Sequence, residues 1–305
     1  MNELITDIKK LQSQTIDNLK NSKASNTIRA YKADIADFMR FCNGHNLRFL
    51  PANPNVVSLY LTYLSKTSKF STLKRRLASI SMYHKTKGHY LDTKHPIISE
   101  NLLGIKRIKG SIQIGKKPLL INDLKLIIQA INKDKISEFE KLKNKSLILV
   151  GFSGGFRRSE LVALLIEDLE FVEEGVKILI RRSKTDQTGE GFVKGIPYFT
   201  NPEYCPVINL KNYINKLNIN NGKVFNICDK SVALKLKKYA MKAGLDFNKY
   251  AGHSLRSGFA TSTAEMGAEE RSIMAMTGHK STQMVRRYIK EANLFKNNAL
   301  NKIKI

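Results

Sequence analysis

One stretch near the C-terminus, residues 252–289, constrains the chain more than any other. It places a histidine and an arginine three residues apart (His253 and Arg256), a second histidine after a glycine (His279), and a tyrosine nine residues later (Tyr288). Each type suits chemistry at a phosphate: arginine holds two oxygens with its planar fork, histidine transfers protons near neutral pH, and tyrosine supplies an oxygen nucleophile. Taken singly, each is more often a packing or surface residue, so the hypothesis depends on partners elsewhere in the chain.

The net charge indicates what such a site would act on. The 305 residues carry a formal net charge of +26, and residues 1–115 hold 19 Lys and Arg against 7 Asp and Glu, so both halves are basic. An excess of this size repels itself unless a polyanion neutralises it, which favours nucleic acid as the partner. A merely Lys-rich protein, or one that binds an anionic membrane, is the alternative.

Cysteine usage and the apolar runs bound the compartment. Cys42, Cys205 and Cys228 show no CxxC pair and no metal-ligand spacing, so we expect reduced, buried thiols and no metal or cofactor. The N-terminus lacks the apolar core of a signal peptide, and the longest apolar run, residues 147–152, is too short to cross a bilayer. These features predict a soluble cytoplasmic protein, associated with the nucleoid if its partner is DNA.

The first 109 residues have the periodicity of short helices. Apolar residues recur every three or four positions, and Asn53 precedes Pro54 as a cap precedes the first helical residue. We therefore predict a helical domain over residues 1–109, a basic linker over 110–117 and a second domain over 118–305. Basic helix faces in the first domain and basic residues in the second are predicted to contact DNA phosphates. They are Lys74, Arg75, Arg76, Lys106, Arg107, Arg181 and Arg182.

The second domain mixes helices with a few strands. β-branched runs at 168–172, 176–182 and 192–198 predict a small antiparallel sheet, and helical patterns precede and follow it. The predicted fold class is therefore mainly α with a small antiparallel β-sheet, in two domains.

Two further motifs complete the site. Residues 151–161, GFSGGFRRSEL, indicate a helix, a glycine turn and a new helix that begins near Arg157 and carries Glu160. Lys184 lies at the tip of the hairpin between the second and third strands. Either motif alone would indicate no more than a capped helix or a solvated lysine.

The ordered set of motifs resembles a known family. An Arg in G-x-R-x-x-E-L, a Lys in a hairpin S-K-T, then H-x-x-R, G-H and a Tyr nine residues later are the pattern of the tyrosine recombinases, or phage integrase family. Within that family the chain looks closest to Cre, over residues 51–65, 71–88 and 273–300. One departure is His279, where Cre has tryptophan and the wider family usually has histidine.

The resemblance implies a mechanism. Tyr288 would attack a DNA phosphorus to give a 3′-phosphotyrosine, with Arg157 and Arg256 on the non-bridging oxygens. His253 would take the tyrosine proton, Lys184 would protonate the leaving oxygen, His279 would donate to the phosphate, and Glu160 would orient its neighbours. Covalent storage of the bond makes ATP unnecessary, and the two guanidiniums make a metal ion unnecessary.

The resemblance also implies an assembly on double-stranded DNA. We expect a C-shaped clamp around the duplex, a homodimer on an inverted-repeat, lox-like site and a homotetramer in the synapse. The apolar tail would be donated to a neighbouring protomer, although a helix packed on its own subunit would give the same pattern. A type IB topoisomerase, a hairpin telomere resolvase and a DNA-binding protein that cuts nothing remain alternatives, and any need for an accessory protein stays open.

Overall fold

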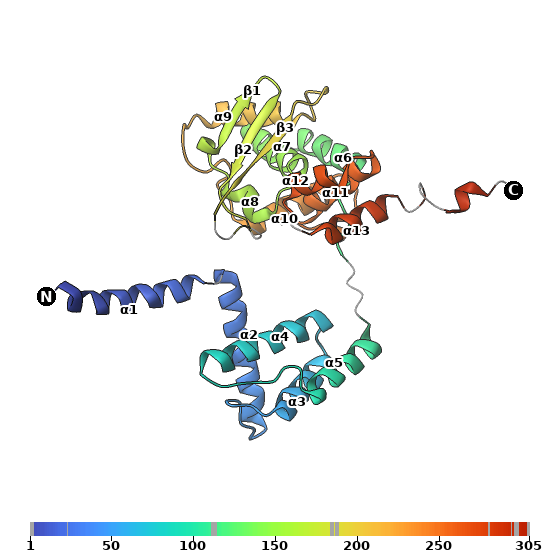
Figure 1. The fold of residues 1–305 in the computed structure, drawn as a ribbon. Helices are drawn as coiled ribbons and strands as arrows, with labels where there is room; N and C mark the ends of the chain where they lie inside the picture. Colours follow the sequence, from blue (N-terminus) through green and yellow to red (C-terminus); the bar gives the residue numbers. More distant parts are fainter. Residues whose placement is uncertain are drawn as a thin grey trace. The chain divides into compact units, whose positions relative to one another are not determined.

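The computed structural model describes residues 3–22, 24–110, 115–183, 186, 189–279, 281–293, 295 and 299–303 (Figure 1). Its contacts divide the chain into two compact units, Met1–Ile114 and Gly115–Ile305. The predicted bounds of the domains and of the basic linker stay a prediction. None of the helices in the described part of the chain is long and apolar enough to cross a membrane.

The first unit is helical. Its helices are α1 (Glu3–Asn21), α2 (Ser25–Gly44), α3 (Pro54–Ser65), α4 (Phe70–Thr86) and α5 (Pro96–Lys109). The start of α3 follows the sequence, because the Asn53 side chain accepts from the Asn55 amide at 2.9 Å and Pro54 takes the first helical position. Phe38, Tyr60 and Leu73 are fully buried in the core that α2, α3 and α4 share.

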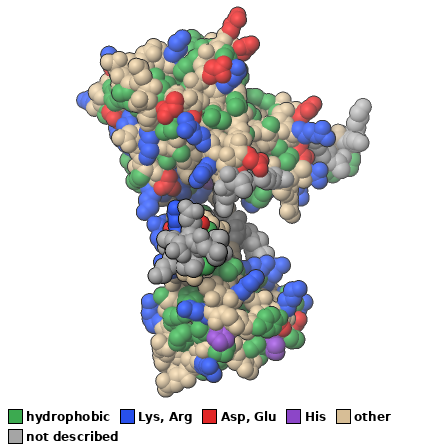
Figure 2. All heavy atoms as spheres, turned by 60° about the vertical axis from the view of Figure 1, so that its left-hand side comes forward, with side chains coloured by type: hydrophobic (Ala, Val, Ile, Leu, Met, Phe, Trp, Pro, Cys, Tyr) green, Lys and Arg blue, Asp and Glu red, His purple; other side chains and the backbone are tan. Residues whose placement is uncertain are grey.

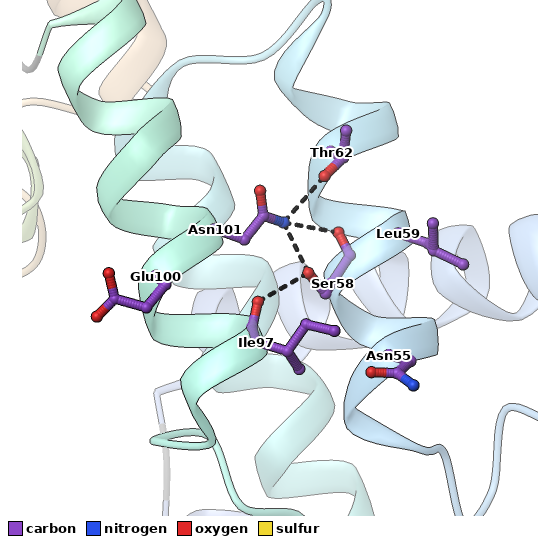
Figure 3. A pocket seen from close by; sticks show the side chains of 7 residues that line it. All are labelled: Asn55, Ser58, Leu59, Thr62, Ile97, Glu100 and Asn101. Carbon is purple, nitrogen blue, oxygen red and sulfur yellow. Dashed lines mark hydrogen bonds between the residues drawn. The ribbon is translucent and has the colours of Figure 1, made fainter.

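A ladder of polar contacts joins α5 to α3. The Asn101 side-chain amide donates to the Ser58 carbonyl at 3.0 Å, to the Ser58 hydroxyl at 2.8 Å and to the Thr62 hydroxyl at 2.9 Å. The Ser58 hydroxyl in turn donates to the Ile97 carbonyl at 2.9 Å, and these side chains point toward one another across the two helices (Figure 3). Since each donor has a partner, the ladder fixes how α5 lies on α3.

The second unit combines a small sheet with helices. The elements before and within the sheet are α6 (Ile121–Asn132), α7 (Glu138–Ser153), α8 (Arg158–Ala163), β1 (Leu169–Val172), β2 (Gly175–Ile180) and β3 (Phe192–Pro197). Those after it are α9 (Pro206–Leu217), α10 (Asp229–Lys242), α11 (Ser254–Glu265), α12 (Glu270–Thr277) and α13 (Thr282–Ala292). Short 3-10 turns lie at Ile166–Asp168, Phe247–Lys249 and Ala299–Lys302.

The sheet is antiparallel and lies to one side of the helices (Figure 1). Its order is β1-β2-β3, with Leu169 opposite Ile178 and Ile180 opposite Phe192. Alternate residues of β2 are buried against the helices, as the period of a half-buried strand requires. The predicted fold class, mainly α with a small antiparallel sheet, is confirmed.

A short segment ahead of α6 fixes the start of α11. The Lys117 amide donates to the Lys249 carbonyl at 2.8 Å, and the Leu119 amide donates to the Ser254 carbonyl at 2.9 Å. Gly258 permits this approach, because a Cβ there would lie 2.1 Å from the Leu119 carbonyl oxygen. The backbone that begins α11, and with it His253, is therefore held from outside the helix.

The cysteines follow the sequence prediction only in part. All three are free, and Cys42 and Cys205 are buried as expected. Cys228 is exposed, so the prediction that it is buried is wrong. It occupies the N-cap position of α10, where its sulfur lies 3.2 Å from the Ser231 hydroxyl instead of in the core.

Candidate active site

A glycine turn between α7 and α8 positions Arg157. Gly155 has a φ of +55°, a conformation that favours glycine, and Arg157 follows as the N-cap of α8. Glu160 accepts from the Arg157 amide at 2.9 Å and from its guanidinium at 2.6 Å. With Glu160 only 3% exposed, this pair holds both the backbone and the side chain of Arg157.

Arg256 lies beside that turn as a buried guanidinium. It is 1% exposed, donates to the Gly155 carbonyl at 2.9 Å and contacts Nε2 of His279 at 3.1 Å. Its Nε has no hydrogen-bond partner among the described residues. Burial, and next the charge of Arg157, lower the pKa of Arg256 to about 10. The position is therefore electropositive and suits an anion.

The contacts of His279 define its tautomer. The Thr277 hydroxyl donates to the Ile273 carbonyl at 2.6 Å and lies 2.8 Å from Nδ1 of His279, so Nδ1 carries the proton. Nε2 then accepts from Arg256. Burial first, and the charges of Arg256 and Arg157 next, lower the pKa of His279 to about 4, so the ring is neutral at pH 7.

His253 contacts Tyr288 directly. Its Nε2 lies 3.2 Å from the Tyr288 hydroxyl, within the reach of a proton transfer. Although His253 as a residue is exposed, protein atoms around its ring, and the charge of Arg256 next, lower its pKa. The imidazole is therefore neutral at pH 7 and able to accept a proton.

Tyr288 is held by apolar packing on α13. It is 7% exposed and belongs to a small cluster with Ala260, Ile273 and Val285, where α11, α12 and α13 meet. The structure thus brings together Arg157, Glu160, His253, Arg256, His279 and Tyr288. Lys184, the remaining predicted site residue, lies outside the described residues, and the roles of all seven stay predictions.

The structure adds Lys194, which the sequence motifs do not single out. It lies on β3, is 1% exposed, and donates from Nζ to the Gly154 carbonyl at 2.6 Å. Burial lowers its pKa to about 7, and the charges of Arg256 and Arg157 act in the same direction. The signal was available: Phe192, Lys194 and Ile196 alternate along a strand, which places the lysine on the inward face.

The predicted DNA contacts in the first unit differ in their surroundings. Arg75 and Arg76 both pair with Asp34, and Arg76 also lies 3.2 Å from Asp37. They meet at a buried carboxylate, Asp34, with Arg76 partly buried and Arg75 still exposed to solvent. Lys74 is exposed, with its ammonium 5.5 Å from the centre of the Phe70 ring.

The remaining predicted contacts lie at the surface. Lys106 and Arg107 are exposed in the last turn of α5. Arg181 pairs with Asp168 at 2.6 Å and keeps more than half of its side chain exposed, and Arg182 is exposed as well. Figure 2 shows Lys and Arg side chains scattered over the surface of both units. Contact of these residues with DNA stays a prediction.

Family models and sequence relatives match most of the chain. The family model "Phage integrase family" matches residues 118–294, and "Phage integrase, N-terminal SAM-like domain" matches residues 16–88. A relative from Selenomonas ruminantium, "Integrase/recombinase xerD homolog", is 41% identical over 300 residues, which cover 93% of this chain and 87% of the relative. "Tyrosine recombinase XerC" from Thermodesulfovibrio yellowstonii is 25% identical and covers 88% and 87%.

Solved structures share the fold at lower identity. The XerH site-specific recombinase, in a post-cleavage complex with palindromic difH, has a TM-score of 0.62 at 18% identity and covers 81% of this chain and 73% of its own. A lambda integrase dimer on a COC′ core site has a TM-score of 0.60 at 14% identity and covers 97% and 79%. These relatives do not test the finer resemblance to Cre. The chain belongs to the phage integrase family and is a tyrosine recombinase.

Proposed function

We propose that the protein is a site-specific DNA recombinase that cuts and rejoins strands through a 3′-phosphotyrosine at inverted-repeat target sites. The observation that carries the proposal is the 3.2 Å contact between His253 Nε2 and the Tyr288 hydroxyl, beside the buried Arg256. Tyrosine has an ordinary pKa of about 10, so a neutral histidine at this distance supplies the base that it needs.

The chemistry balances with the residues present. The Tyr288 oxygen forms a bond to phosphorus, the bond from phosphorus to the 5′-oxygen breaks, and His253 takes the phenolic proton. Arg256 and Arg157 stabilise the negative charge that grows on the non-bridging oxygens. Lys184 protonates the leaving 5′-oxygen in this proposal. Attack by a 5′-hydroxyl of a partner strand reverses the step and joins the DNA in a new pairing.

His279 enters this scheme with a condition. Its Nδ1 proton is committed to Thr277, and its Nε2 accepts from Arg256. A donation to the phosphate therefore requires a second proton, on Nε2. A bound phosphate favours protonation of Nε2, because a nearby anion raises the pKa of an imidazole.

The net charge and the similar solved structures support DNA as the partner and an assembly of several protomers on it. A net charge of +26 suits a polyanion, and the XerH relative is described on a palindromic site and the lambda integrase as a dimer on its core site. We extend this to a dimer of this protein on an inverted repeat, closed on the duplex as a clamp, and to a tetramer when two sites pair. Such a protein would act in the cytoplasm at the nucleoid.

The tail has an acceptor of fitting chemistry in the second unit. An apolar cavity of about 580 Å³ is lined chiefly by hydrophobic side chains, among them Leu124, Phe152 and Phe259. Phe295 is 80% exposed and Leu300 is 67% exposed in the tail. Because exposed apolar side chains of this size favour burial, we propose that the tail of one protomer occupies this cavity in its neighbour.

A covalent trap tests the proposal. Duplexes bound by the protein are selected from a random library, nicked near the cleavage position, and incubated with wild type, Tyr288→Phe and Tyr250→Phe. Tyr250 is the matched control, since its hydroxyl also makes a partly buried hydrogen bond, to Asp123 at 2.7 Å. We expect a band of retarded protein–DNA adduct in a denaturing gel for wild type and Tyr250→Phe but none for Tyr288→Phe.

Other outcomes select other functions. Tight binding without any adduct would indicate a DNA-binding protein that cuts nothing. An adduct followed only by relaxation of supercoils would indicate a topoisomerase, and closed hairpin ends would indicate a telomere resolvase. An equal adduct from Tyr288→Phe would show that another residue is the nucleophile.

A further inference from the structure

Lys194 is a buried charge to which the chemistry above assigns no step. Its ammonium lies 4.3 Å from the ring centre of Phe156 and 5.6 Å from that of Phe192, and the side chain is 1% exposed. Burying an ammonium costs free energy that an apolar side chain would not. Ile196 lies two residues further on the same face of β3 and is also buried, and it is an apolar residue of the kind that usually fills such a position.

The contacts of Lys194 converge with those of Arg256 on one turn. Lys194 donates to the carbonyl of Gly154 at 2.6 Å, and Arg256 donates to the carbonyl of Gly155 at 2.9 Å. Two cations from different elements, β3 and α11, therefore hold consecutive carbonyls. The same turn leads directly into Arg157, the N-cap of α8. A shift of this turn would move both arginines.

The charges around Lys194 do not balance. Arg157 and Arg256 face it from α8 and α11, and Glu160 of α8 is the carboxylate that opposes them. Burial and the two arginines outweigh Glu160 and bring the pKa of Lys194 to about 7. A phosphate arriving at the arginines would add the missing negative charge.

We propose that Lys194 is a positioning residue, which holds the Gly154–Gly155 turn so that Arg157 and Arg256 converge on the scissile phosphate. The inference rests on the proposed function, because it concerns how the arginines of that reaction are held. Lys194 acts through its neighbours and does not touch the DNA. Its charge belongs to the electropositive site, which the bound phosphate neutralises.

Two substitutions separate positioning from simple packing. Lys194→Met keeps most of the length of the side chain and removes the charge and the donor. Lys194→Arg keeps the charge and the donor and stays protonated at all relevant pH values. Lys145→Met is the matched control, since Lys145 on α7 is also partly buried, with a pKa lowered by burial, but is opposed by Glu203 and Glu138. Each variant is assayed for affinity, for adduct formation on the nicked duplex, and for Tm.

We expect Lys194→Met to bind DNA within about 3-fold of wild type but to form the adduct about 100-fold more slowly, the effect typical of lost preorganisation. Its Tm should be equal to that of wild type or higher, because a buried charge has been removed. Lys194→Arg should restore at least a tenth of the rate. At limiting DNA the wild-type rate should fall as pH rises through 7, and this fall should be absent in Lys194→Arg.

Other results of these experiments would contradict the proposal. Adduct formation by Lys194→Met at the wild-type rate, or a fall in Tm that accounts for its lost activity, would overturn the positioning role and leave the proposed function intact. An unchanged pH dependence in Lys194→Arg would contradict the part played by the charge. No adduct from wild type would overturn the proposed function and this inference together.

Discussion

Two buried charge clusters, one in each unit, show opposite solutions to the same problem. In the first unit, Asp34 is 2% exposed and pairs with Arg75 and Arg76, and its carboxylate also accepts from the Ser79 hydroxyl at 2.7 Å. Asp37 adds a second carboxylate to Arg76. The two guanidiniums thus meet two carboxylates, so this part of the cluster is neutral without any ligand. Arg40 also contacts Asp37, at 3.3 Å, but its side chain is exposed to solvent.

The cluster in the second unit lacks that balance. Arg157, Arg256 and Lys194 surround a single buried carboxylate, Glu160. The lowered pKa values of Arg256 and Lys194 are the consequence, because each cation is partly buried beside others. A neutral cluster fixes a fold, whereas a cluster with excess charge keeps a place for an anion at a cost in stability.

The largest effect is expected from Arg256→Met. Adduct formation should fall by about 100- to 1,000-fold, because a donor to the transition-state charge is lost. The Tm should stay within about 3 °C of wild type or rise, since the removed charge was unbalanced. Kinetics on the nicked duplex and thermal denaturation measure the two effects. A fall in Tm that parallels the loss of activity would make this cluster a structural one.

Asp34→Ala should act in the opposite way. It removes the buried partner of Arg75 and Arg76. Since Arg75 is exposed and Arg76 keeps Asp37, we expect a loss of about 1.5–3 kcal/mol, the contribution of hydrogen bonds to a charged group. Urea denaturation should show the loss, and hydrogen exchange should place it in α2 and α4. Asp37→Ala is the graded control, since the Asp37 side chain is 30% exposed and should matter less. Equal effects of the two substitutions would argue against a buried neutral cluster.

Glu160→Gln enlarges the imbalance without changing the shape of the side chain. Arg157 exchanges a charge-assisted hydrogen bond for a neutral one. Charge-assisted bonds contribute about 1.5–3 kcal/mol and neutral ones about 1 kcal/mol, so adduct formation should fall by about 3- to 30-fold. The pKa of Lys194 should fall further, because Glu160 raises it in wild type. The pH profile of adduct formation at limiting DNA measures this, and a profile identical to that of wild type would contradict the coupling.

The smallest effect concerns His253 and pH. Protonated His253 cannot accept the tyrosine proton, so activity should be lost as pH falls through its lowered pKa, below the ordinary value of 6.5. The charge of Arg158 contributes to that lowering. Arg158→Met should therefore move the acid limb of the profile up by a few tenths of a pH unit. A shift in the other direction would exclude this electrostatic cause.

Local signals in the sequence predicted much of the molecule. The cap at Asn53 and the β-branched runs of the three strands depend on residues that are neighbours in the chain. The structure likewise brings His253, Arg256 and Tyr288 together in the way that their motif predicts.

What escaped prediction depends on contacts between distant segments. Arg75 meets Asp34 across 41 residues, and Lys194 meets Gly154 across 40, so neither partner is visible in a local pattern. The sequence therefore predicts DNA contacts alike for the basic residues of α4, and its motifs do not single out Lys194. Only the position of Lys194 between Phe192 and Ile196, on the inward face of β3, distinguishes it from the exposed lysines.

The most direct test of the account is to identify the amino acid that carries the DNA. The adduct formed by wild-type protein on the nicked duplex is digested with nuclease and protease, and the peptide that retains a nucleotide is sequenced by mass spectrometry. We predict a nucleotide linked through phosphate to Tyr288, in a peptide from α13. A nucleotide on any other residue, or a DNA-free Tyr288 in a preparation that has cleaved its substrate, would contradict the central claim.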